Sequence, residues 1–297
     1  MSMYEIVRKE TIAPGFKLME ITAPQVVESV TPGQFMIIRV NEQGERIPMS
    51  IADWDKEKGT VSVIFQELGT STRKLGLMKV GDRLENLAGP LGEGTEIKNY
   101  GTVICVGGCF GIGPGYILAK MLKEAGNKVI FIVEARYGKI IFWQDKLEEV
   151  VDELIITSGD KTKGVYRWAT KPLRQVLENE MVDKVYLVGC TFMMMTCSKA
   201  TKVYGVDTKV SLLPIMIDGT GMCGACRVTV GDETKLACVD GPEFDGHQVD
   251  WNEIMERAKS YLKEEEKSLD LWVRDNWHKV RYPEAIEKDN QKKARCR

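Results

Sequence analysis

The segment Thr102-Val-Ile-Cys-Val-Gly-Gly-Cys-Phe-Gly-Ile-Gly-Pro114 joins a continuous apolar run to a glycine-rich turn. An apolar stripe at helical spacing follows over residues 117–125, and Gly126 is a plausible helix stop. A strand that enters a glycine-rich turn and opens a helix is the usual context of a phosphate-binding turn. Further apolar runs at 129–133, 151–157 and 185–189 alternate with helical stretches. This alternation predicts a parallel sheet with crossover helices, an α/β domain over residues 99–207.

The preceding residues, 1–98, follow a different pattern. Short runs rich in Val, Ile and Phe recur at 16–21, 35–40 and 60–65, and Gly, Pro and Asp separate them. Even spacing of this kind predicts an antiparallel barrel or sandwich.

Three closely spaced cysteines mark a third region, residues 208–249. The sequence reads Asp218-Gly-Thr-Gly-Met-Cys223-Gly-Ala-Cys226, with Cys238 after eleven further residues. The plant-type [2Fe–2S] pattern is C-x4-C-x2-C with a distant fourth cysteine, and Asp218 stands in the first place here. The glycines suit a tight loop around a cluster. Two alternatives remain open: a zinc site with one carboxylate and three thiolates, or an Asp218 that only caps the turn.

Two polar stretches of the first domain are candidate flavin ligands. Arg46-Ile-Pro-Met-Ser50 offers a guanidinium for a phosphate and a hydroxyl for a flavin ring nitrogen. Gly69-Thr70-Ser71-Thr72 offers backbone amides and hydroxyls to a pyrophosphate. An ordinary polar turn is the alternative for the second stretch.

The turn after residue 106 is the candidate nucleotide site, and its candidate ligands are Gly107, Gly108, Gly111, Gly113 and Pro114. Glu134 closes the next predicted strand, 21 residues after Gly113. An acidic residue there can bind a ribose 2′-hydroxyl and disfavour a 2′-phosphate. A solvated strand end is the alternative reading of Glu134.

Composition limits the functional classes. The 297 residues are 43% hydrophobic and 28% charged, with a net charge of −2, which is ordinary for a globular protein and gives no basic face for nucleic acid. No run of about 18 apolar residues predicts a membrane span, and the first residues lack an apolar signal core, so we expect a cytoplasmic protein. The eight cysteines are then ligands or buried thiols rather than disulfides, and we expect Cys105, Cys109, Cys190 and Cys197 to be buried thiols.

A strand is predicted at 209–217, before the cysteines. The last part of the chain, residues 250–297, is predicted to form a helical extension. Asp250 and Glu253 make a pair resembling a capping box at its start. Trp272 and Trp277 in a charged tail suit a partner interface, although they could equally fold back on their own domain.

Several of these motifs together carry a family resemblance. Pro32-Gly-Gln-Phe35, residues 46–50, Gly89-Pro-Leu-Gly92 and residues 107–114 resemble the ferredoxin-reductase superfamily. The cluster segment, with Cys238-Val-Asp-Gly-Pro-Glu-Phe244, resembles the electron-transfer subunits of dihydroorotate dehydrogenase. It is more similar still to the small subunits of NADH-dependent reduced ferredoxin:NADP oxidoreductase, also called sulfide dehydrogenase, which have Asp in the first ligand position and a helical extension.

The resemblance implies an antiparallel FAD-binding β barrel, an α/β nicotinamide-nucleotide domain and a [2Fe–2S] module with ligands Asp218, Cys223, Cys226 and Cys238. It also assigns Ile64 and Phe65 to the flavin site. The family's small subunit forms a heterodimer with a larger subunit that carries another FAD and [4Fe–4S] clusters and deals with ferredoxin. The implied activity is an NAD(P)H-dependent oxidoreductase that moves electrons between cluster, FAD and nucleotide, as the high-potential branch in electron-bifurcating members.

The nucleotide signatures depart from the family pattern in four places. Cys109, Phe110 and Gly113 intrude in the turn, Glu134-Ala-Arg-Tyr-Gly-Lys139 replaces the usual run, Ser158-Gly-Asp-Lys161 replaces an acidic stretch, and Gly189-Cys-Thr-Phe-Met-Met194 varies the last motif. We therefore expect a divergent paralogue that uses another nucleotide, binds one weakly or serves a non-bifurcating reaction. The alternative function is a pure electron relay with a vestigial or repurposed nucleotide site.

Overall fold

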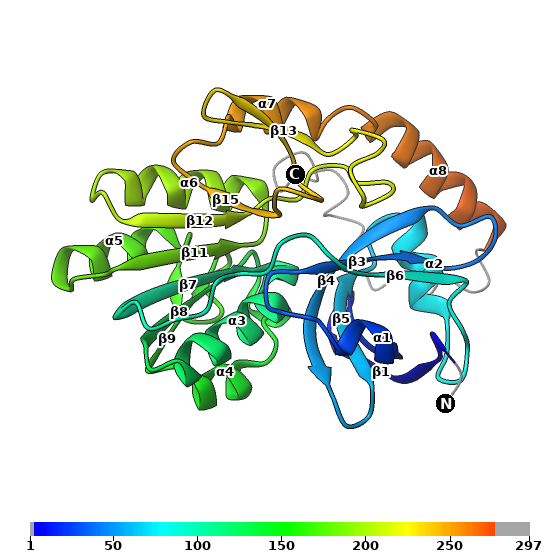
Figure 1. Cartoon of the computed structure of the whole chain (residues 1–297), viewed down its shortest axis with the longest axis horizontal. Helices are drawn as coiled ribbons and strands as arrows, with labels where there is room; N and C mark the ends of the chain where they lie inside the picture. The colour runs from blue at the N-terminus through cyan, green and yellow to red at the C-terminus, as the bar shows by residue number, and fades with distance from the viewer. Residues whose placement is uncertain (1–2, 277–297) are drawn as a thin grey trace.

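The structure, a computed structural model, describes residues 3–276. Two sheets lie beside each other, and the C-terminal part of the chain arches over both of them (Figure 1).

The N-terminal sheet has six strands in the order β1-β2-β5-β4-β3-β6, and its neighbours pair antiparallel. An antiparallel bridge from Glu5 to Arg83 links the start of the first strand to the segment before the last one. The barrel interior holds fully buried side chains such as Met19, Ile38 and Val63. The predicted antiparallel barrel is confirmed. Its elements are β1 (Ile6–Ala13), β2 (Phe16–Thr22), α1 (Pro24–Val27), β3 (Phe35–Arg39), β4 (Arg46–Asp55), β5 (Thr60–Gln66), α2 (Thr70–Leu77) and β6 (Asn86–Leu91).

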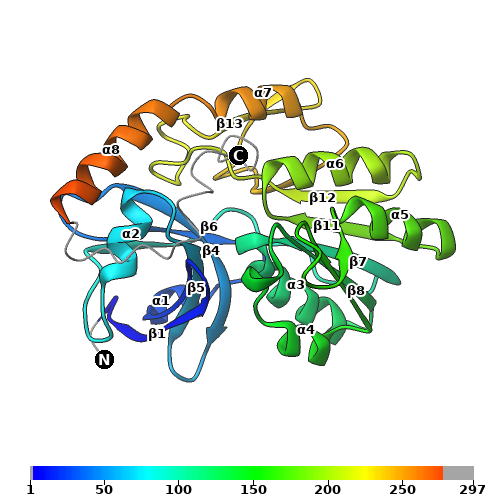
Figure 2. The same cartoon turned by 180° about the vertical axis from the view of Figure 1, so that it is seen from behind.

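The second sheet has seven strands in the order β10-β9-β8-β7-β11-β12-β15, parallel except for the last. Helices α3 and α4 cover one face and α5 and α6 the other (Figure 2). This confirms the predicted α/β domain. The elements are β7 (Thr102–Gly108), η1 (Cys109–Gly111), α3 (Ile112–Glu124), β8 (Lys128–Ala135), η2 (Gly138–Ile140), α4 (Gln144–Val150), β9 (Glu153–Ser158), β10 (Val165–Tyr166), α5 (Thr170–Asn179), β11 (Lys184–Val188) and α6 (Thr191–Lys202).

The cysteine-bearing region shares this sheet. The strand expected at 209–217 is shorter than predicted: β12 (Asp207–Ser211) ends before Pro214, which has no amide hydrogen to continue a ladder. After the cysteine loop, β13 (Arg227–Val230) and β14 (Glu233–Leu236) form a hairpin. The chain then returns as β15 (Glu243–Asp245), antiparallel to β12. The sheet thus continues past the expected boundary at residue 207.

The C-terminal extension begins with α7 (Trp251–Arg257) and continues as α8 (Leu262–Asp275). The Asp250 carboxylate caps α7 as predicted, because it accepts hydrogen bonds from the amides of Asn252 and Glu253. Glu253 does not complete a capping box; its carboxylate instead accepts from the amide of Thr229 and fixes α7 to the hairpin. Helix α8 reaches from the cysteine region to α2 of the barrel (Figure 1).

The structure also places the other cysteines and the tryptophans of the extension. Cys105 and Cys197 are buried thiols as predicted, while Cys109 and Cys190 are half-buried. Trp272 is half-buried on α8, and Trp277 lies outside the described residues. Within residues 3–276, no helix is both long and apolar enough to cross a membrane.

Candidate functional site

The cysteine loop is folded around the Asp218 carboxylate. Its two oxygens accept hydrogen bonds from the amide of Thr220 at 3.2 Å and from the amide of Cys223 at 3.0 Å. The Cys223 thiol lies 3.3 Å from the same carboxylate. The amide of Thr220 contributes most to lowering the pKa of Asp218, which favours the ionised form. Asp218 therefore caps the turn and is also held against Cys223, and its role as a cluster ligand stays a prediction.

The other two thiols form a second pair. Cys226 and Cys238 are buried, with their sulfurs 3.2 Å apart. The amide of Ala237 donates to the carbonyl of Cys226, so the hairpin brings Cys238 back to the loop. Burial raises the pKa of the Cys238 thiol, and binding to a metal would replace its proton.

The arrangement in two pairs fits a [2Fe–2S] cluster. Each iron of such a cluster takes two protein ligands, so Asp218 with Cys223 would hold one iron and Cys226 with Cys238 the other. A carboxylate has lone pairs enough to accept the two amides and still bind a metal. Among residues 3–276, no group of three or more His, Cys, Asp or Glu side chains is placed to hold a single metal ion.

Glycines give the loop its shape. Gly219, Gly221 and Gly224 have φ values of +76°, +85° and +63°, a region that residues with a Cβ rarely adopt. A Cβ on Gly219 would lie 2.8 Å from side-chain carbons of both Ile37 and Leu91. The cysteine loop therefore packs directly on the barrel.

The flavin candidates of β4 lie on the face of the barrel that meets this loop. Ser50 pairs with Phe35, and Pro48 pairs with Ile37, across β3 and β4. Phe35 and Ile37 belong to the same core as Cys226, so the row of alternate side chains at Arg46, Pro48 and Ser50 borders the cluster module. Met49 points the other way, into the barrel interior.

The other flavin candidates, Ile64 and Phe65 of β5, have buried side chains. Ile64 packs between the barrel and the α/β domain, where a Cβ on Gly113 would lie 2.9 Å from it. Phe65 is 2% exposed in the barrel interior, so only its backbone could face a bound cofactor.

Polar contacts already occupy the start of α2. The Thr70 hydroxyl lies 3.0 Å from that of Ser268 on α8, and Ser71 donates to the Glu45 carboxylate at 2.6 Å. The Thr72 hydroxyl accepts from the amides of Leu68 and Gly69. The expected pyrophosphate site is thus bordered by α8, a contact that nothing in the sequence indicated.

The glycine-rich turn after β7 is shaped by close packing. A Cβ on Gly108 would lie 2.7 Å from the Met193 sulfur, and one on Gly111 would lie 2.1 Å from the carbonyl oxygen of Val188. Gly107 is similarly close to Phe131, and Cys109 has a φ of +52°. Pro114 opens toward a small space between the barrel and the α/β domain. These close contacts explain why positions 107, 108 and 111 need glycine. The phosphate-binding role of the turn stays a prediction.

Glu134 lies at the end of β8 as predicted, but its side chain is only 6% exposed. Its carboxylate accepts a hydrogen bond at 2.7 Å from the amide of Ala169, at the start of α5. The ribose-binding role of Glu134 stays a prediction, and the structure gives its carboxylate a structural partner.

A pocket of about 570 Å³ lies between the α/β domain, the cysteine region and the C-terminal extension. Phe110 and Cys190 line it at the carboxyl ends of β7 and β11, where nucleotides bind in open α/β sheets. Arg227 lines it from beside the cluster loop, and Arg257 and Tyr261 line it from the C-terminal extension. Sequence reasoning missed Arg227 and Arg257, because their place in the pocket depends on how the extension folds back.

The antiparallel barrel, the α/β sheet and the paired cysteine loop define a flavin and iron–sulfur electron-transfer protein of the ferredoxin-reductase class. Residues 214–250 match the iron–sulfur cluster binding domain of dihydroorotate dehydrogenase B. The chain is 41% identical over 273 residues to the dihydroorotate dehydrogenase B electron transfer subunit homolog of Thermotoga maritima, covering 92% of this chain and 96% of the relative. It is 29% identical over 248 residues to the corresponding subunit of Desulforamulus reducens, covering 81% and 94%.

Solved structures agree. A chain of the NADH-dependent reduced ferredoxin-NADP oxidoreductase, a structure described for flavin-based electron bifurcation, superimposes with a TM-score of 0.87 at 41% identity. The match covers 92% of this chain and 99% of that one. The Amycolatopsis cytochrome P450 reductase GcoB, at 18% identity and a TM-score of 0.57, shares the fold.

This protein belongs to the family of dihydroorotate dehydrogenase B electron-transfer subunits and their homologues. The expected family, fold, electron-transfer function and cofactor set of FAD and a [2Fe–2S] cluster are confirmed. It is an oxidoreductase subunit, and its relatives are named as subunits of larger enzymes.

Proposed function

We propose that this chain moves electrons between a nicotinamide nucleotide at the carboxyl end of its α/β sheet, FAD on the barrel and a [2Fe–2S] cluster held by Asp218, Cys223, Cys226 and Cys238. When bound, FAD supplies both hydride exchange with the nucleotide and single-electron exchange with the cluster. The protein's own part is to fix the positions of the three groups and to tune them.

One observation carries the proposal. The barrel face with Arg46, Pro48 and Ser50 is the face on which the cluster loop packs through Gly219. A flavin bound along that face would therefore lie next to the cluster. The same face borders the α/β domain, since Ser50 and Pro114 line one small space. The pocket lined by Phe110, Cys190 and Arg227 lies between the α/β domain, the cluster loop and the C-terminal extension.

We assign the flavin diphosphate to Arg46 and to the start of α2, at Gly69, Thr70, Ser71 and Thr72. A guanidinium and a helix N-terminus are both suited to phosphate, and they belong to one domain here. The flavin ring would then lie toward Pro48 and Ser50.

The surface around the cluster supports a larger partner subunit. Met222 is 89% exposed, Ile217 51% and Val239 45%, and Cys223 itself is exposed. Exposed apolar side chains around a redox centre suit a docking surface that brings a second centre close. We infer that the partner is a larger flavin and iron–sulfur subunit, with ferredoxin reached through it, and that the complex is cytoplasmic.

The alternative of a pure electron relay rests on the altered turn. Cys109 and Phe110 place side chains where a pyrophosphate would need close approach to the backbone. In that case the flavin would exchange electrons with protein-bound centres, the cluster of this chain and a centre of a partner subunit, and not with a nucleotide.

The experiment compares the wild-type complex with Cys238→Ser, which removes one ligand of the buried pair. We expect nucleotide still to bleach the flavin of this chain in the variant, while electrons no longer reach the partner subunit. Electron paramagnetic resonance shows whether the variant lacks the cluster. If a variant without the cluster reduced the partner subunit at the wild-type rate, the proposed path would be contradicted. A flavin that no nucleotide reduces in the wild-type complex would favour the relay.

A further inference from the structure

The ends of β8 and β9 decide which nucleotide the α/β domain prefers. When a nucleotide lies across the turn after the first strand, its adenosine ribose lies at the end of the next strand. A free carboxylate there binds the ribose 2′-hydroxyl and repels a 2′-phosphate, whereas cations attract the phosphate. The charges presented at this edge therefore distinguish NAD(H) from NADP(H).

The acidic residue at this edge is turned inward. Side chains alternate along β8, and Ile130 and Ile132 point into the core beneath α5 and α6. Glu134 continues that row, is 6% exposed and accepts a hydrogen bond from the amide of Ala169. Its carboxylate is therefore committed to the start of α5 and does not present a negative surface to a ribose.

Two loop segments, rather than the Glu134 carboxylate, cover the ends of β8 and β9. The amide of Gly138, after β8, donates to the carboxylate of Asp160 at 3.1 Å and to the hydroxyl of Thr162 at 3.2 Å. A Cβ on Gly159 would lie 3.0 Å from the carbonyl oxygen of Arg136. Residues 136–140 and 159–167 thus form one continuous surface.

That surface is basic. Its two segments contain one carboxylate, Asp160, which the amides of Gly138 and Thr162 already use. Against it stand five cations: Arg136, Lys139, Lys161, Lys163 and Arg167.

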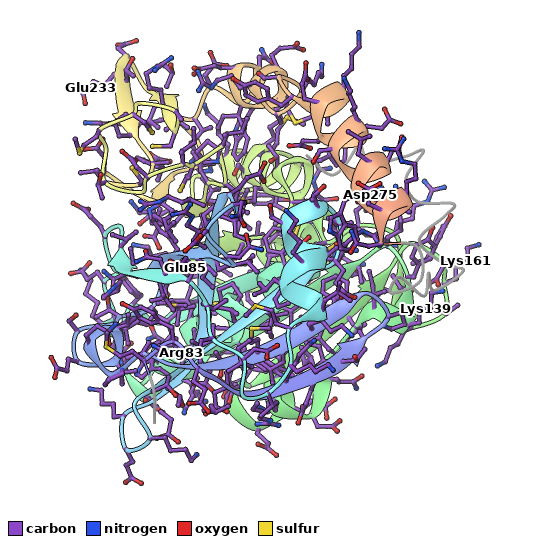
Figure 3. The ribbon with its side chains drawn as sticks, turned by 90° about the vertical axis from the view of Figure 1, so that its right-hand side faces the viewer. Arg83, Glu85, Lys139, Lys161, Glu233 and Asp275 are labelled. Atoms are coloured by element: carbon purple, nitrogen blue, oxygen red, sulfur yellow. The ribbon has the colours of Figure 1, made fainter. Side chains whose placement is uncertain are left out.

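Two of the cations meet at a single aromatic ring. The Lys161 ammonium lies 4.3 Å and the Arg167 guanidinium 5.0 Å from the centre of the exposed Tyr166 ring. Lys139 and Lys161 both project toward solvent on one side of the molecule (Figure 3). The cations therefore gather at one edge rather than spreading over the domain.

We propose that these segments bind the 2′-phosphate of NADP(H), with Lys161 and Arg167 as its principal contacts, so that this chain prefers the 2′-phosphorylated nucleotide. The inference rests on the proposed function for the presence of a nucleotide site and adds its substrate class. A phosphate placed between an ammonium and a guanidinium gains charge-assisted hydrogen bonds that NAD(H) cannot make.

The test uses fragments that differ only in the phosphate and needs no electron transfer. Binding of 2′,5′-ADP, 3′,5′-ADP and 5′-AMP to the flavin-loaded full-length chain is measured by calorimetry at low salt. We expect 2′,5′-ADP to bind about tenfold or more tightly than 5′-AMP and more tightly than 3′,5′-ADP, and the preference to shrink with added salt.

The double variant Lys161→Glu/Arg167→Glu should abolish that preference. The matched control Lys56→Glu/Lys199→Glu makes the same change in net charge at exposed positions on the barrel and on α6, and it should keep the preference. Retention in the control shows that local rather than overall charge is responsible.

The inference would be overturned if 2′,5′-ADP bound no more tightly than 5′-AMP, if the two bisphosphates bound equally, or if no fragment bound. If the fragments show no preference while NADH reduces the flavin, the inference fails and the proposed function stands. If 2′,5′-ADP binds selectively while neither NADH nor NADPH reduces the flavin, the proposed function fails and the specificity of the site stands.

Discussion

Ile37 of the barrel lies directly against Gly219 of the cluster loop, so closely that a Cβ on the glycine would be 2.8 Å from the Ile37 side chain. Ile37 is also the cross-strand partner of Pro48, in the row of flavin candidates on β4. Ile37 thus belongs both to the proposed flavin face and to the contact with the proposed cluster loop. The contact needs a residue without a side chain at 219, because the φ of +76° and the close approach both exclude a Cβ.

Gly219→Ala should therefore displace the cluster loop. The new methyl group meets Ile37 and Leu91, and overpacking adds about 1–3 kcal/mol to the cost of about 1–2 kcal/mol for a left-handed alanine. We expect a lower free energy of unfolding and a reduced iron content per chain, measured by denaturation and by iron analysis.

Gly205→Ala is the matched control, since Gly205 has a φ of +66° but no atom within 4 Å of its ideal Cβ position. It should show the backbone cost alone and keep its iron. Equal destabilisation and equal iron content in the two variants would show that the contact with the barrel does not matter.

Asp218→Cys should assemble a cluster with four thiolates. Exchange of a carboxylate for a thiolate changes charge donation to the iron, so we expect a changed visible spectrum and a changed cluster potential in a redox titration. The variant also loses the oxygens that accept from Thr220 and Cys223, so the iron content must be confirmed first. An unaltered spectrum and potential in a fully loaded variant would remove Asp218 from the ligand set.

Helix α8 should slow the release of FAD. It borders the proposed diphosphate site through Ser268 and Thr70, and it covers little other surface, with Leu269 as its one buried residue. We expect a chain ending at Ser260 to release FAD faster than the full-length chain in a fluorescence assay. Ser268→Ala should account for about two- to tenfold of the effect, the worth of one hydrogen bond.

A chain ending at Asn276 controls for loss of the residues that follow α8. It should retain FAD like the full-length chain. The role of α8 is refuted if the two shortened chains release FAD at the same rate.

Glu243 should make stability depend on pH. It lies half-buried at the join between barrel and α/β domain, accepts a hydrogen bond from the Thr95 hydroxyl at 2.8 Å, and faces Lys209, Lys184 and Asp207. Burial outweighs the hydrogen bond and the lysines and raises its pKa above the ordinary 4.5. The folded state therefore holds this proton more tightly than the unfolded state does.

The stabilisation is fully present below pH 4.5 and is lost as the pH rises through the folded-state pKa. The free energy of unfolding of the wild-type chain minus that of Glu243→Gln, measured by urea denaturation, should fall with rising pH over this range. A difference that stays constant or rises would show that Glu243 is not held in this way.

The sequence was most informative where covalent spacing sets the geometry. The places of Cys223 and Cys226 follow from a short loop, and the structure pairs Cys223 with Asp218 and Cys226 with Cys238. The strand, turn and helix around Gly107 were likewise predictable, because apolar periodicity reflects burial.

Sequence reasoning failed where the outcome depends on long-range packing. Nothing local to Glu134 shows that Ala169, 35 residues later, supplies the partner of its carboxylate. The contact of Ser268 with Thr70 spans 198 residues and depends on the path of the whole extension. The strand predicted at 209–217 was too long, because the prediction followed the apolar residues and gave too little weight to Pro214.

The most direct test of the electron path is an anaerobic spectroscopic titration of the complex between this chain and its larger subunit. NADPH is added first and NADH second, and the flavin and the cluster of this chain are followed at separate wavelengths. We expect NADPH to bleach the flavin and the cluster to be reduced after it. Reduction of both centres by dithionite but by neither nucleotide would contradict the proposed electron path.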